Sequence, residues 1–537
     1  MKTVGMYLTD LLAAYGVDTV FGIPGVHTVE LYRGLADSHI RHVTARHEQS
    51  LGFMADGYAR VSGKPGVCFV ITGPGLTNIA TAMGQAYADS IPMLVISGVN
   101  ALGKLGSGNG HLHELPDQHG FAREVSAFSH TVTRPSELPQ VLARAFAVFD
   151  GARPRPVHIE IPLDLMSASA EQLPAIPARP VRITAGPADS SAIAEAAQWL
   201  QSAERPLLLL GGGALAASDL TATLAERLDA PTVMTINARG LLPAGHPLGL
   251  SFSPSCSAVR RLAADSDMVL AIGTEIGQTD YDAYVDGGFA LPGKLIRIDI
   301  DPEQLFRNRA ADLALLGDAR ATVAALLEQL AEPGRMRHGA ERALATRMAG
   351  GDDLSALMRD DLVFLHAVRD ALPDARFVGD STRQVYAGDL GFVANAPRSW
   401  FNASTGFGSL GYGLPAAVGA ALAADQPVVC LVGDGGIQFT LAELGTAVET
   451  GARLIVLLLN NGGYGEIKAA MLDAGVPPVG VDLHTPDFVT LARAYGWHAE
   501  RFERGNSIAE LVRVAATRSQ PTLIEILDHD GSTLRGH

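Results

Sequence analysis

Short apolar runs alternate with amphipathic segments along the whole chain, and we expect the runs to form strands. These runs are 19–22, 67–72, 157–161, 206–210, 268–272, 295–300, 376–378, 428–432, 454–459 and 522–527. Strands that alternate with helical patterns are typical of parallel sheets. The pattern predicts an α/β protein with three parallel-sheet domains, at residues 1–167, 190–332 and 355–537. The segments 168–190 and 333–354 are expected to be linkers.

Polar residues follow two neighbouring apolar runs of the third predicted domain. Gly433-Asp434-Gly435 follows the first run, and Asn460-Asn461 follows the second. Between them, Thr440 and Glu443 have the spacing of a capping box, and Gly451 is suited to end a helix. The segment therefore predicts a right-handed strand–helix–strand unit. Both polar tips would lie at the same edge of a parallel sheet, where α/β folds bind ligands.

The chemistry of these tips suits a diphosphate and its metal ion. Asp434 offers an anionic oxygen and Asn461 a neutral one, and Mg²⁺ takes such ligands together with phosphate and water. Glycines let backbone N–H groups approach a phosphate closely. Either motif alone would be ordinary turn chemistry. Together, at this spacing, they resemble the signature of the thiamine diphosphate (ThDP) enzyme family.

Three upstream motifs resemble the same family in order and spacing. They are Phe21-Gly22-Ile23-Pro24-Gly25, the stretch 43–60 around Glu48, and Thr72-Gly73-Pro74-Gly75-Leu76-Thr77-Asn78. The resemblance implies that the Glu48 carboxyl bonds the pyrimidine ring of ThDP and so promotes ionisation of the thiazolium carbon. It also implies that Thr72 binds the cofactor. A lone glutamate beside a histidine would more often be a solvated charge at a helix end, but the accompanying motifs argue against that reading.

The resemblance also identifies cofactor contacts in the third block. The carbonyl of Gly408 would accept from the aminopyrimidine, and Leu410 would lie under the bend of the cofactor. Ser381 and Thr382 would meet the diphosphate, although such hydroxyls also cap helices. The residues implied to hold the diphosphate and Mg²⁺ are Gly433, Asp434, Gly435, Gly436, Asn461 and Gly463, of which Asp434, Asn461 and the Gly463 carbonyl would bind the metal.

The family is built from a pyrimidine domain, a middle domain and a diphosphate domain, so the resemblance covers essentially the whole chain. It implies an obligate homo-oligomer, a dimer or a tetramer, with shared active sites. In that arrangement Glu48 of one subunit serves the cofactor that Asp434 and Asn461 of another subunit hold. A monomer would be inactive.

Two glycine clusters are weaker signals of nucleotide binding. Gly406-Phe407-Gly408-Ser409-Leu410-Gly411 matches a dinucleotide fingerprint, but residues 402–405 before it are polar rather than a strand run. Gly211-Gly212-Gly213 follows a good strand but is a single cluster. Family members that bind FAD carry two arginines in a middle-domain run. The equivalent stretch, 273–282, has neither, which argues against FAD.

Composition narrows the class of protein further. The chain has 537 residues, 47% of them hydrophobic, with 58 Gly, which suits a large α/β protein. Its net charge of −16 argues against nucleic acid, which needs a basic face. Cys68, Cys256 and Cys430 lack metal-ligand spacing, and no apolar run is long enough to span a membrane. We expect a soluble cytoplasmic enzyme.

The loop 110–119, which lines the substrate pocket in this family, contains several candidate catalytic residues. His111 and His113 are candidate proton donors, because an imidazole titrates near neutrality; the alternative is a surface histidine. Glu114 and Glu466 could give the pocket a negative charge that suits a guanidinium, or they could be solvated loop acids. Asp117 is more simply a solvated acid.

Two further positions distinguish this chain from pyruvate decarboxylases. Those enzymes have an acid directly after the Gly-x-Pro-Gly turn, where this chain has Val26 and then His27. They also have a glutamate six residues after the second Asn, where this chain has Ile467 preceded by Glu466. We expect Val26, His27 and Glu114 to bind substrate and Glu466 to act in catalysis.

The loop 111–118 and the segments 278–282 and 460–466 resemble those of the 2-ketoarginine decarboxylases of bacterial arginine catabolism. The hypothesis is non-oxidative decarboxylation of a small-molecule 2-oxo acid, favoured as 5-guanidino-2-oxopentanoate (2-ketoarginine), to an aldehyde and CO₂. The alternative is an acetolactate synthase-like carboligase that acts on pyruvate. A non-catalytic binding protein on a ThDP fold is a third reading, but Glu48, Asp434 and Asn461 are all present.

Overall fold

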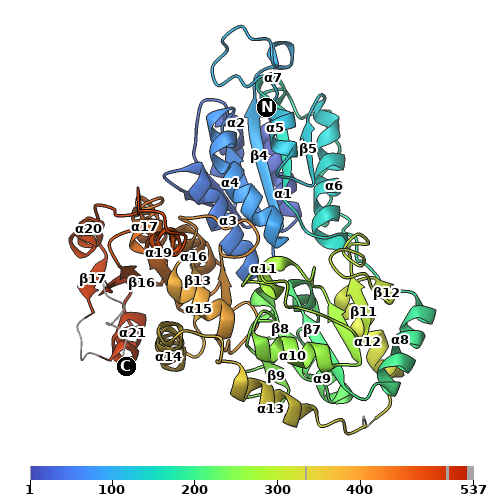
Figure 1. Cartoon of the computed structure of the whole chain (residues 1–537). Helices are drawn as coiled ribbons and strands as arrows, with labels where there is room; N and C mark the ends of the chain where they lie inside the picture. The colour runs from blue at the N-terminus through green and yellow to red at the C-terminus, as the bar shows by residue number, and fades with distance from the viewer. Residues whose placement is uncertain (1, 333–334, 503–506, 529–537) are drawn as a thin grey trace.

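The chain folds into three domains, each built on a six-stranded sheet with helices on its faces (Figure 1). The computed structural model describes residues 2–332, 335–502 and 507–528. All strand pairs of the three sheets are parallel. The predicted α/β fold with three parallel sheets is therefore confirmed.

The N-terminal domain, blue to cyan in Figure 1, has the strand order β2-β1-β3-β4-β6-β5. Its strands and helices are, in chain order, α1 (Val4–Ala14), β1 (Thr19–Gly22), α2 (Val29–Ala36), β2 (Arg41–Thr44), α3 (Glu48–Ser62), β3 (Gly66–Val70), α4 (Pro74–Asp89), β4 (Met93–Val99), α5 (Gln118–Arg123), β5 (Phe128–Thr131), α6 (Leu138–Gly151), β6 (Val157–Pro162) and α7 (Leu163–Met166). The central strands β3 and β4 are buried along their whole length, as expected of strands covered on both faces.

The middle domain has the strand order β12-β11-β10-β7-β8-β9. Its elements are α8 (Ser190–Ser202), β7 (Pro206–Leu210), α9 (Thr221–Leu228), β8 (Thr232–Met234), β9 (Gly249–Leu250), α10 (Ser257–Asp265), β10 (Met268–Ile272), α11 (Gln278–Tyr281), β11 (Lys294–Asp299), β12 (Leu313–Leu316) and α12 (Ala319–Gln329). The order reverses between β10 and β7, which gives this sheet a topological switch point.

The C-terminal domain has the strand order β14-β13-β15-β16-β18-β17. Its elements are α14 (Ala356–Ala371), β13 (Arg376–Gly379), α15 (Arg383–Gly391), β14 (Trp400–Asn402), α16 (Gly413–Ala423), β15 (Val428–Gly433), α17 (Asp434–Ile437), α18 (Glu443–Thr450), β16 (Leu454–Asn460), α19 (Gly465–Asp473), α20 (Phe488–Ala494), β17 (His498–Arg501), α21 (Ile508–Ala516) and β18 (Thr522–Leu527). The predicted strand–helix–strand unit is present, because β15 and β16 pair in parallel with α18 between them.

Close helix packing joins the N- and C-terminal domains. A Cβ at Gly57 of α3 would lie 2.0 Å from the carbonyl oxygen of Ala416 in α16, and one at Gly419 would lie 1.9 Å from that of Met54. Only glycine allows the two backbones to approach so closely. One hydrophobic cluster therefore runs through both domains, and a second joins the middle and C-terminal domains.

The segment 333–354, predicted as a linker, contains a helix, α13 (Gly339–Ala349). Its Ala343 is fully buried, and its arginines bind carbonyl groups of the middle domain. Arg342 Nη1 lies 3.0 Å from Pro206 O, and Arg347 Nη1 lies 2.9 Å from Gly249 O. The charged residues that indicated a linker therefore anchor a helix.

The capping box predicted at Thr440 and Glu443 is not formed. The Thr440 hydroxyl donates to Gly411 O at 2.9 Å, and Glu443 Oε1 accepts from the backbone N–H of Arg46 at 2.9 Å. Both side chains are taken up by tertiary contacts. Gly451 does end α18, in the left-handed conformation. Across the residues that the structure describes, we find no helix long and apolar enough to cross a membrane.

Candidate functional site

The first polar centre lies at the carboxyl edge of the C-terminal sheet. Gly433 ends β15 and Asn460 ends β16, and Gly433 is in register with Leu459 of the neighbouring strand. Asp434 begins the short helix α17 directly after β15, and Asn461 follows β16. The parallel register therefore brings the two polar tips together, and the backbone N–H of Asn461 donates to Asp434 Oδ1 at 3.2 Å.

Three oxygen-bearing groups converge at this centre. The terminal amide of Asn461 lies 3.1 Å from Asp434 Oδ1 and 2.8 Å from the carbonyl oxygen of Gly463. If the NH₂ of Asn461 points toward Asp434 and Gly463, it donates a hydrogen bond to each of them. If the amide oxygen points that way, three oxygens face one another, as they do around a cation. Asp434 is 1% exposed, and its Oδ2 has no hydrogen-bond partner. Burial raises the pKa of this carboxyl above its usual value, against backbone N–H groups that lower it. These residues fit a bound divalent ion.

This centre differs from a metal site made only of ionisable side chains. Among the described residues, no group of three His, Cys, Asp or Glu side chains is arranged to hold a metal ion. One carboxylate, one amide and one carbonyl leave several positions to other ligands. Mg²⁺ commonly fills such positions with phosphate oxygens and water.

The adjoining turns leave little space for larger side chains. A Cβ at Gly435 would lie 2.8 Å from the ring of Tyr464, and one at Gly433 would lie 3.1 Å from Thr382 Oγ1. Thr382 caps α15, but its hydroxyl makes no cap hydrogen bond, and the Ser381 hydroxyl lies 3.5 Å from that of Ser404. The Thr382 hydroxyl bonds Gln384 Oε1 only at the long distance of 3.5 Å, so the hydroxyls of Ser381 and Thr382 remain available to a ligand beside Gly433.

The buried carboxylate of Asp380 holds a second turn against this edge. It accepts from the backbone N–H groups of Ser381 at 2.8 Å, Gly413 at 3.0 Å and Gly411 at 3.3 Å. Burial raises the pKa of Asp380 to about 6 in spite of these bonds. The carboxylate thus ties the end of β13 to the start of α16.

The loop before α16 carries Gly408 and Leu410. Gly408 is exposed with a φ of 75°, and Leu410 is half-buried. As expected, the polar residues directly before the glycine cluster form no strand, because the short strand β14 ends at Asn402. Two amides of the cluster are also not free for a phosphate, because Ser409 N donates to Gln85 Oε1 at 3.1 Å and Gly411 N to Asp380.

The second polar centre lies in the N-terminal domain, at the first turns of α3 and α4. Glu48 begins α3, and its Oε2 accepts from Asn78 Nδ2 at 2.9 Å. A Cβ at Gly75 would lie 3.5 Å from Glu48 Oε1. The hydroxyl of Thr72 is buried and has no hydrogen-bond partner. The fold therefore gathers residues of two widely spaced sequence motifs around one carboxylate.

The loop 110–119, which is predicted to line the substrate pocket, packs against the Thr72–Gly73 turn. A Cβ at Gly73 would lie 2.3 Å from the carbonyl oxygen of His113, and the His113 ring stands edge-on to His27 with centroids 5.3 Å apart. His27 is 8% exposed and its Nδ1 has no partner. Burial and the nearby His113 lower the pKa of His27, which favours the neutral form of its ring. By contrast, Val26 is 67% exposed.

The two candidate substrate-binding acids have different environments. Glu114 accepts from Gly108 N at 2.8 Å, Ser107 Oγ at 3.1 Å and His111 N at 3.2 Å, all in its own loop. These donors lower the pKa of Glu114. Glu466, on α19, is solvent-exposed in the single chain, although partial desolvation raises its pKa against the attraction of Arg383.

Sequence reasoning missed two residues that organise the second centre. Asn78 belongs to the quoted motif, yet its bond to Glu48 depends on how α3 and α4 pack. Gln118 is 4% exposed and joins Gly73 N at 2.9 Å to Glu160 Oε2 at 2.9 Å. A buried glutamine at the start of a helix leaves no mark in the hydrophobic pattern, so only its place in the loop could have indicated it.

Each centre makes its hydrogen bonds within its own domain. Glu48 bonds to Asn78 of its own domain, while Asp434 bonds to the segment after β16. Within residues 2–332, 335–502 and 507–528, no hydrogen bond or ion pair joins Glu48 to Asp434, Asn461 or Gly463.

Comparison with known proteins identifies the family of the three domains. Residues 2–123 match the thiamine pyrophosphate (TPP) enzyme N-terminal TPP binding domain, residues 193–326 the central domain, and residues 378–526 the C-terminal TPP binding domain. The probable 2-ketoarginine decarboxylase AruI of Pseudomonas aeruginosa is 48% identical over 98% of this chain and 94% of its own length. The acetolactate synthase of Arthrospira platensis is 32% identical over 97% of this chain and 93% of its own length.

A solved structure agrees with these sequence matches. The X-ray structure of a protein from Mycobacterium smegmatis, assigned as a thiamin diphosphate-dependent enzyme, superposes with a TM-score of 0.82. It is 25% identical, and the match covers 98% of this chain and 99% of that one. The chain therefore belongs to the thiamine pyrophosphate enzyme family and is an enzyme of that family.

Proposed function

We propose that this enzyme uses ThDP and Mg²⁺ to decarboxylate a 2-oxo acid without oxidation, with 5-guanidino-2-oxopentanoate as the favoured substrate. The observation that carries the substrate is the 48% identity, over 98% of the chain, to a probable 2-ketoarginine decarboxylase. In the reaction the bond between the carboxyl and carbonyl carbons breaks and CO₂ leaves. A proton takes its place on the carbonyl carbon, which gives an aldehyde.

The C-terminal centre would hold the diphosphate and its metal. Its unpartnered Asp434 oxygen and the converging oxygens of Asn461 and Gly463 support this role. The hydroxyls and glycine amides proposed to bind the phosphate oxygens are those of Ser381, Thr382, Gly433, Gly435 and Gly436. When bound, ThDP supplies the electron sink for the bond that breaks.

The N-terminal centre would hold the pyrimidine end of the cofactor. Asn78 fixes one oxygen of Glu48, which leaves the other for a ring nitrogen. The buried Thr72 hydroxyl lacks a partner in the chain and can bond the cofactor. Gly408 would offer its carbonyl to the amino group, and Leu410 would support the bend between the two rings.

Histidines beside this centre would accept and donate protons during the reaction. His27 and His113 face each other next to the Thr72–Gly73 turn, and burial favours the neutral form of His27. A neutral imidazole can accept a proton and a protonated one can return it to the carbon that has lost CO₂. We assign the delivery of that proton to His113 or to His111 of the same loop.

Glu466 is the better of the two acids for the substrate guanidinium. Glu114 already accepts three hydrogen bonds from its own loop, whereas Glu466 is exposed beside the metal-binding segment. A carboxylate pairs with guanidinium through two parallel bonds. Val26 and His27 would contact the aliphatic part of the substrate.

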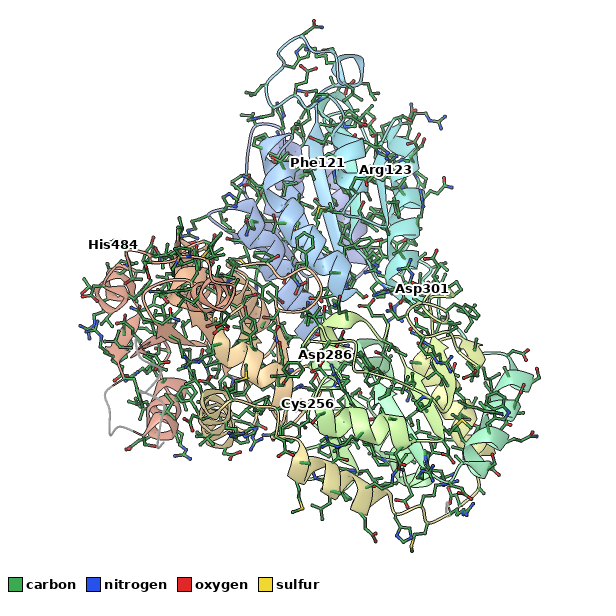
Figure 2. All side chains as sticks on the ribbon, viewed as in Figure 1. Phe121, Arg123, Cys256, Asp286, Asp301 and His484 are labelled. Carbon is green, nitrogen blue, oxygen red and sulfur yellow. The ribbon has the colours of Figure 1, made fainter. Side chains whose placement is uncertain are left out.

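A complete site would need two subunits. Exposed apolar side chains flank both centres, as on surfaces that form interfaces. In the N-terminal domain they include Leu112, which is 59% exposed, and Phe121, which is 42% exposed. Figure 2 labels Phe121 on the upper lobe. In the C-terminal domain they include Phe439, 55% exposed, and Ile467, 54% exposed. We propose that these surfaces meet in a homodimer or homotetramer.

The test is CO₂ release by the pure protein with ThDP and Mg²⁺ from 2-ketoarginine, pyruvate, benzoylformate and branched 2-oxo acids. The proposal predicts equimolar CO₂ and guanidino aldehyde, with 2-ketoarginine preferred. EDTA should abolish the reaction. No CO₂ from any of these acids would overturn it.

Carboligation is the second candidate, because acetolactate synthases match nearly the whole chain at 31% to 33% identity. In that reaction the carbon that has lost CO₂ attacks a second oxo compound rather than a proton. Acetolactate from pyruvate, detected as acetoin after acidification, would favour this candidate over the decarboxylase.

A further inference from the structure

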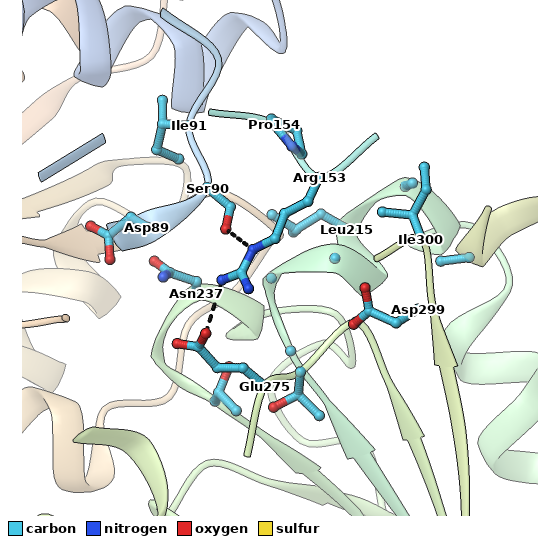
Figure 3. Close-up of a pocket in the computed structure, with 18 of the residues that line it drawn as sticks. Asp89, Ser90, Ile91, Arg153, Pro154, Leu215, Asn237, Glu275, Asp299 and Ile300 are labelled. Atoms are coloured by element: carbon cyan, nitrogen blue, oxygen red, sulfur yellow. Dashed lines mark hydrogen bonds and ion pairs between the residues drawn. The ribbon is translucent and has the colours of Figure 1, made fainter. Parts of the chain in front are cut away.

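A cavity of about 440 Å³ lies where the three domains meet (Figure 3). Its walls come from the turn after α4, from the carboxyl ends of β7, β10 and β11, and from residues 398–406 of the C-terminal domain. The volume is typical of small-molecule sites. The ends of β7 and β10 also form the topological switch point of the middle sheet, where α/β folds bind ligands.

The glycine cluster at this switch point is not a phosphate cradle. Gly211 N donates to Ile272 O at 2.9 Å, and Gly213 N donates to Gly273 O at 3.0 Å. A Cβ at Gly211 would lie 2.2 Å from Gly273 O. The glycines therefore serve to pack two loops together, and these amides are not available to a diphosphate.

The wall of the cavity is acidic. Its charged residues are six acids and three arginines: Asp89, Asp150, Glu275, Asp280, Asp299, Asp318, Arg60, Arg153 and Arg398. Arg60 is already matched by Asp56 at 2.6 Å and Asp89 at 2.5 Å, and Arg153 by Glu275 at 2.9 Å.

Two carboxylates of the wall are attracted to nearby arginines without an ion pair: Asp280 to Arg239, and Asp299 to Arg153 and Arg297. In the described part of the chain no salt bridge reaches Asp280 or Asp299. Burial raises the pKa of Asp280 to about 6 and also raises that of Asp299. The acidic wall disfavours an anionic ligand and favours a cation.

Two buried polar atoms in the wall lack partners within the protein. Gln304 is 2% exposed, and its Oε1 accepts no hydrogen bond. Arg153 donates through Nε to Ser90 and through Nη2 to Glu275, as Figure 3 shows, but its Nη1 has no hydrogen-bond partner. The closest acid to Nη1 is Asp301, 4.0 Å away, at the junction of two lobes in Figure 2. Buried polar atoms without partners are costly, so both atoms point to a polar ligand.

We propose that this cavity binds a basic α-amino acid. Its side-chain guanidinium or ammonium would donate to Asp280, its α-ammonium to Asp299 and Gln304 Oε1, and its carboxylate would accept from Arg153 Nη1. This orientation supplies a cationic group to each of the two acids that make no salt bridge, and a partner to both unsatisfied atoms. The site is distinct from the ThDP centres and does not depend on the reaction proposed for them.

Such a ligand would hold the three domains together. The walls belong to all three domains, so a ligand binds the folded arrangement and not the unfolded chain. Bound ligand therefore raises the thermal midpoint as its concentration rises.

The experiment is calorimetric titration of the full-length protein, without ThDP, using L-arginine, its neutral isostere L-citrulline, and ADP and FAD. L-arginine should bind at least tenfold more tightly than L-citrulline. Asp299→Asn and Asp280→Asn should each weaken arginine binding at least tenfold, since the amide keeps the shape and loses the charge. Glu303→Gln, next to Gln304 but outside the cavity wall, should bind arginine like the wild type.

Three results would overturn the proposal: no arginine binding, arginine binding unchanged in both Asp variants, or binding of ADP or FAD in its place. Arginine binding that Glu466→Gln abolishes and Asp299→Asn spares would assign the amino acid to the ThDP site instead. The thermal midpoint of each correctly folded variant, measured without ligand, shows that a loss of binding is not a loss of folding.

Discussion

The carboxyl edge of the C-terminal sheet and the loop before α5 each carry an acidic residue of the candidate site. The two carboxylates differ in their burial and in their hydrogen bonds. Asp434 is 1% exposed, and its Oδ2 has no partner. Glu114 accepts three hydrogen bonds from its own loop. A buried carboxylate oxygen without a partner costs stability, so a fold retains it where a ligand completes it. A satisfied carboxylate stabilises its own loop. Burial with an unmet hydrogen bond, rather than charge, therefore distinguishes Asp434 from Glu114.

The largest expected effect tests the half-site around Glu48. Glu48→Gln removes the carboxyl that would bond the pyrimidine ring and leaves the metal centre intact. We expect kcat to fall about 10³-fold, within the range for acid–base groups. ThDP binding should stay close to that of the wild type, as fluorescence titration can show. Near-normal turnover would mean that another group activates the cofactor.

The second test asks whether the two half-sites come from different chains. Glu48→Gln and Asp434→Asn should each be inactive alone. Unfolding and refolding an equal mixture should restore about a quarter of wild-type activity, because half of random dimers are mixed and each mixed dimer has one intact site. A mixture that stays inactive would place both halves of each site in one chain.

The third test compares the two acids proposed for substrate recognition. Glu466→Gln should raise KM for 2-ketoarginine about tenfold, the lower end for a charged hydrogen bond, because the site is partly exposed. Glu114→Gln should change KM little and lower the thermal midpoint of the protein, since that carboxylate holds its loop. Steady-state kinetics and thermal unfolding of both variants give the comparison. The reverse pattern would transfer the substrate role to Glu114.

The smallest effect concerns a buried acid that does have partners. Asp389 accepts from Trp400 Nε1 at 2.9 Å and Asn402 Nδ2 at 2.7 Å, yet burial raises its pKa from 3.8 to about 7. A raised carboxyl pKa means that the folded protein resists ionisation. The wild type therefore loses stability relative to Asp389→Asn as pH rises from 3.8 through about 7.

Thermal midpoints of the two proteins at pH 5 and pH 8 test this effect. The thermal midpoint of Asp389→Asn, relative to that of the wild type, should be a few degrees higher at pH 8 than at pH 5. An equal difference at both values would show that Asp389 does not titrate in this range.

Much of the fold could be predicted because buried parallel strands appear in the sequence as short apolar runs. Strand β18 spans Thr522–Leu527 as expected, and β15 and β16 each extend only slightly beyond the predicted limits. The polar tips could be placed at one sheet edge because parallel register leaves no other arrangement. These features depend on local pattern and on the geometry of parallel sheets.

Features that depend on distant contacts could not be predicted. Helix α13 lies in a segment with the composition of a linker and is held by Arg342 and Arg347 on carbonyls of another domain. The expected capping box fails because Glu443 bonds Arg46 of the N-terminal domain. For the same reason the sequence could not show that Glu114 is satisfied by its loop while Asp434 is not.

The most direct test of the account is ThDP binding in the presence and absence of Mg²⁺, measured by calorimetry on the wild type, Asp434→Asn and Glu114→Gln. The account predicts that the wild type and Glu114→Gln bind ThDP only with Mg²⁺ and that Asp434→Asn loses this binding. Binding by Asp434→Asn equal to that of the wild type would contradict it, because the unpartnered carboxylate would then have no part in holding the cofactor.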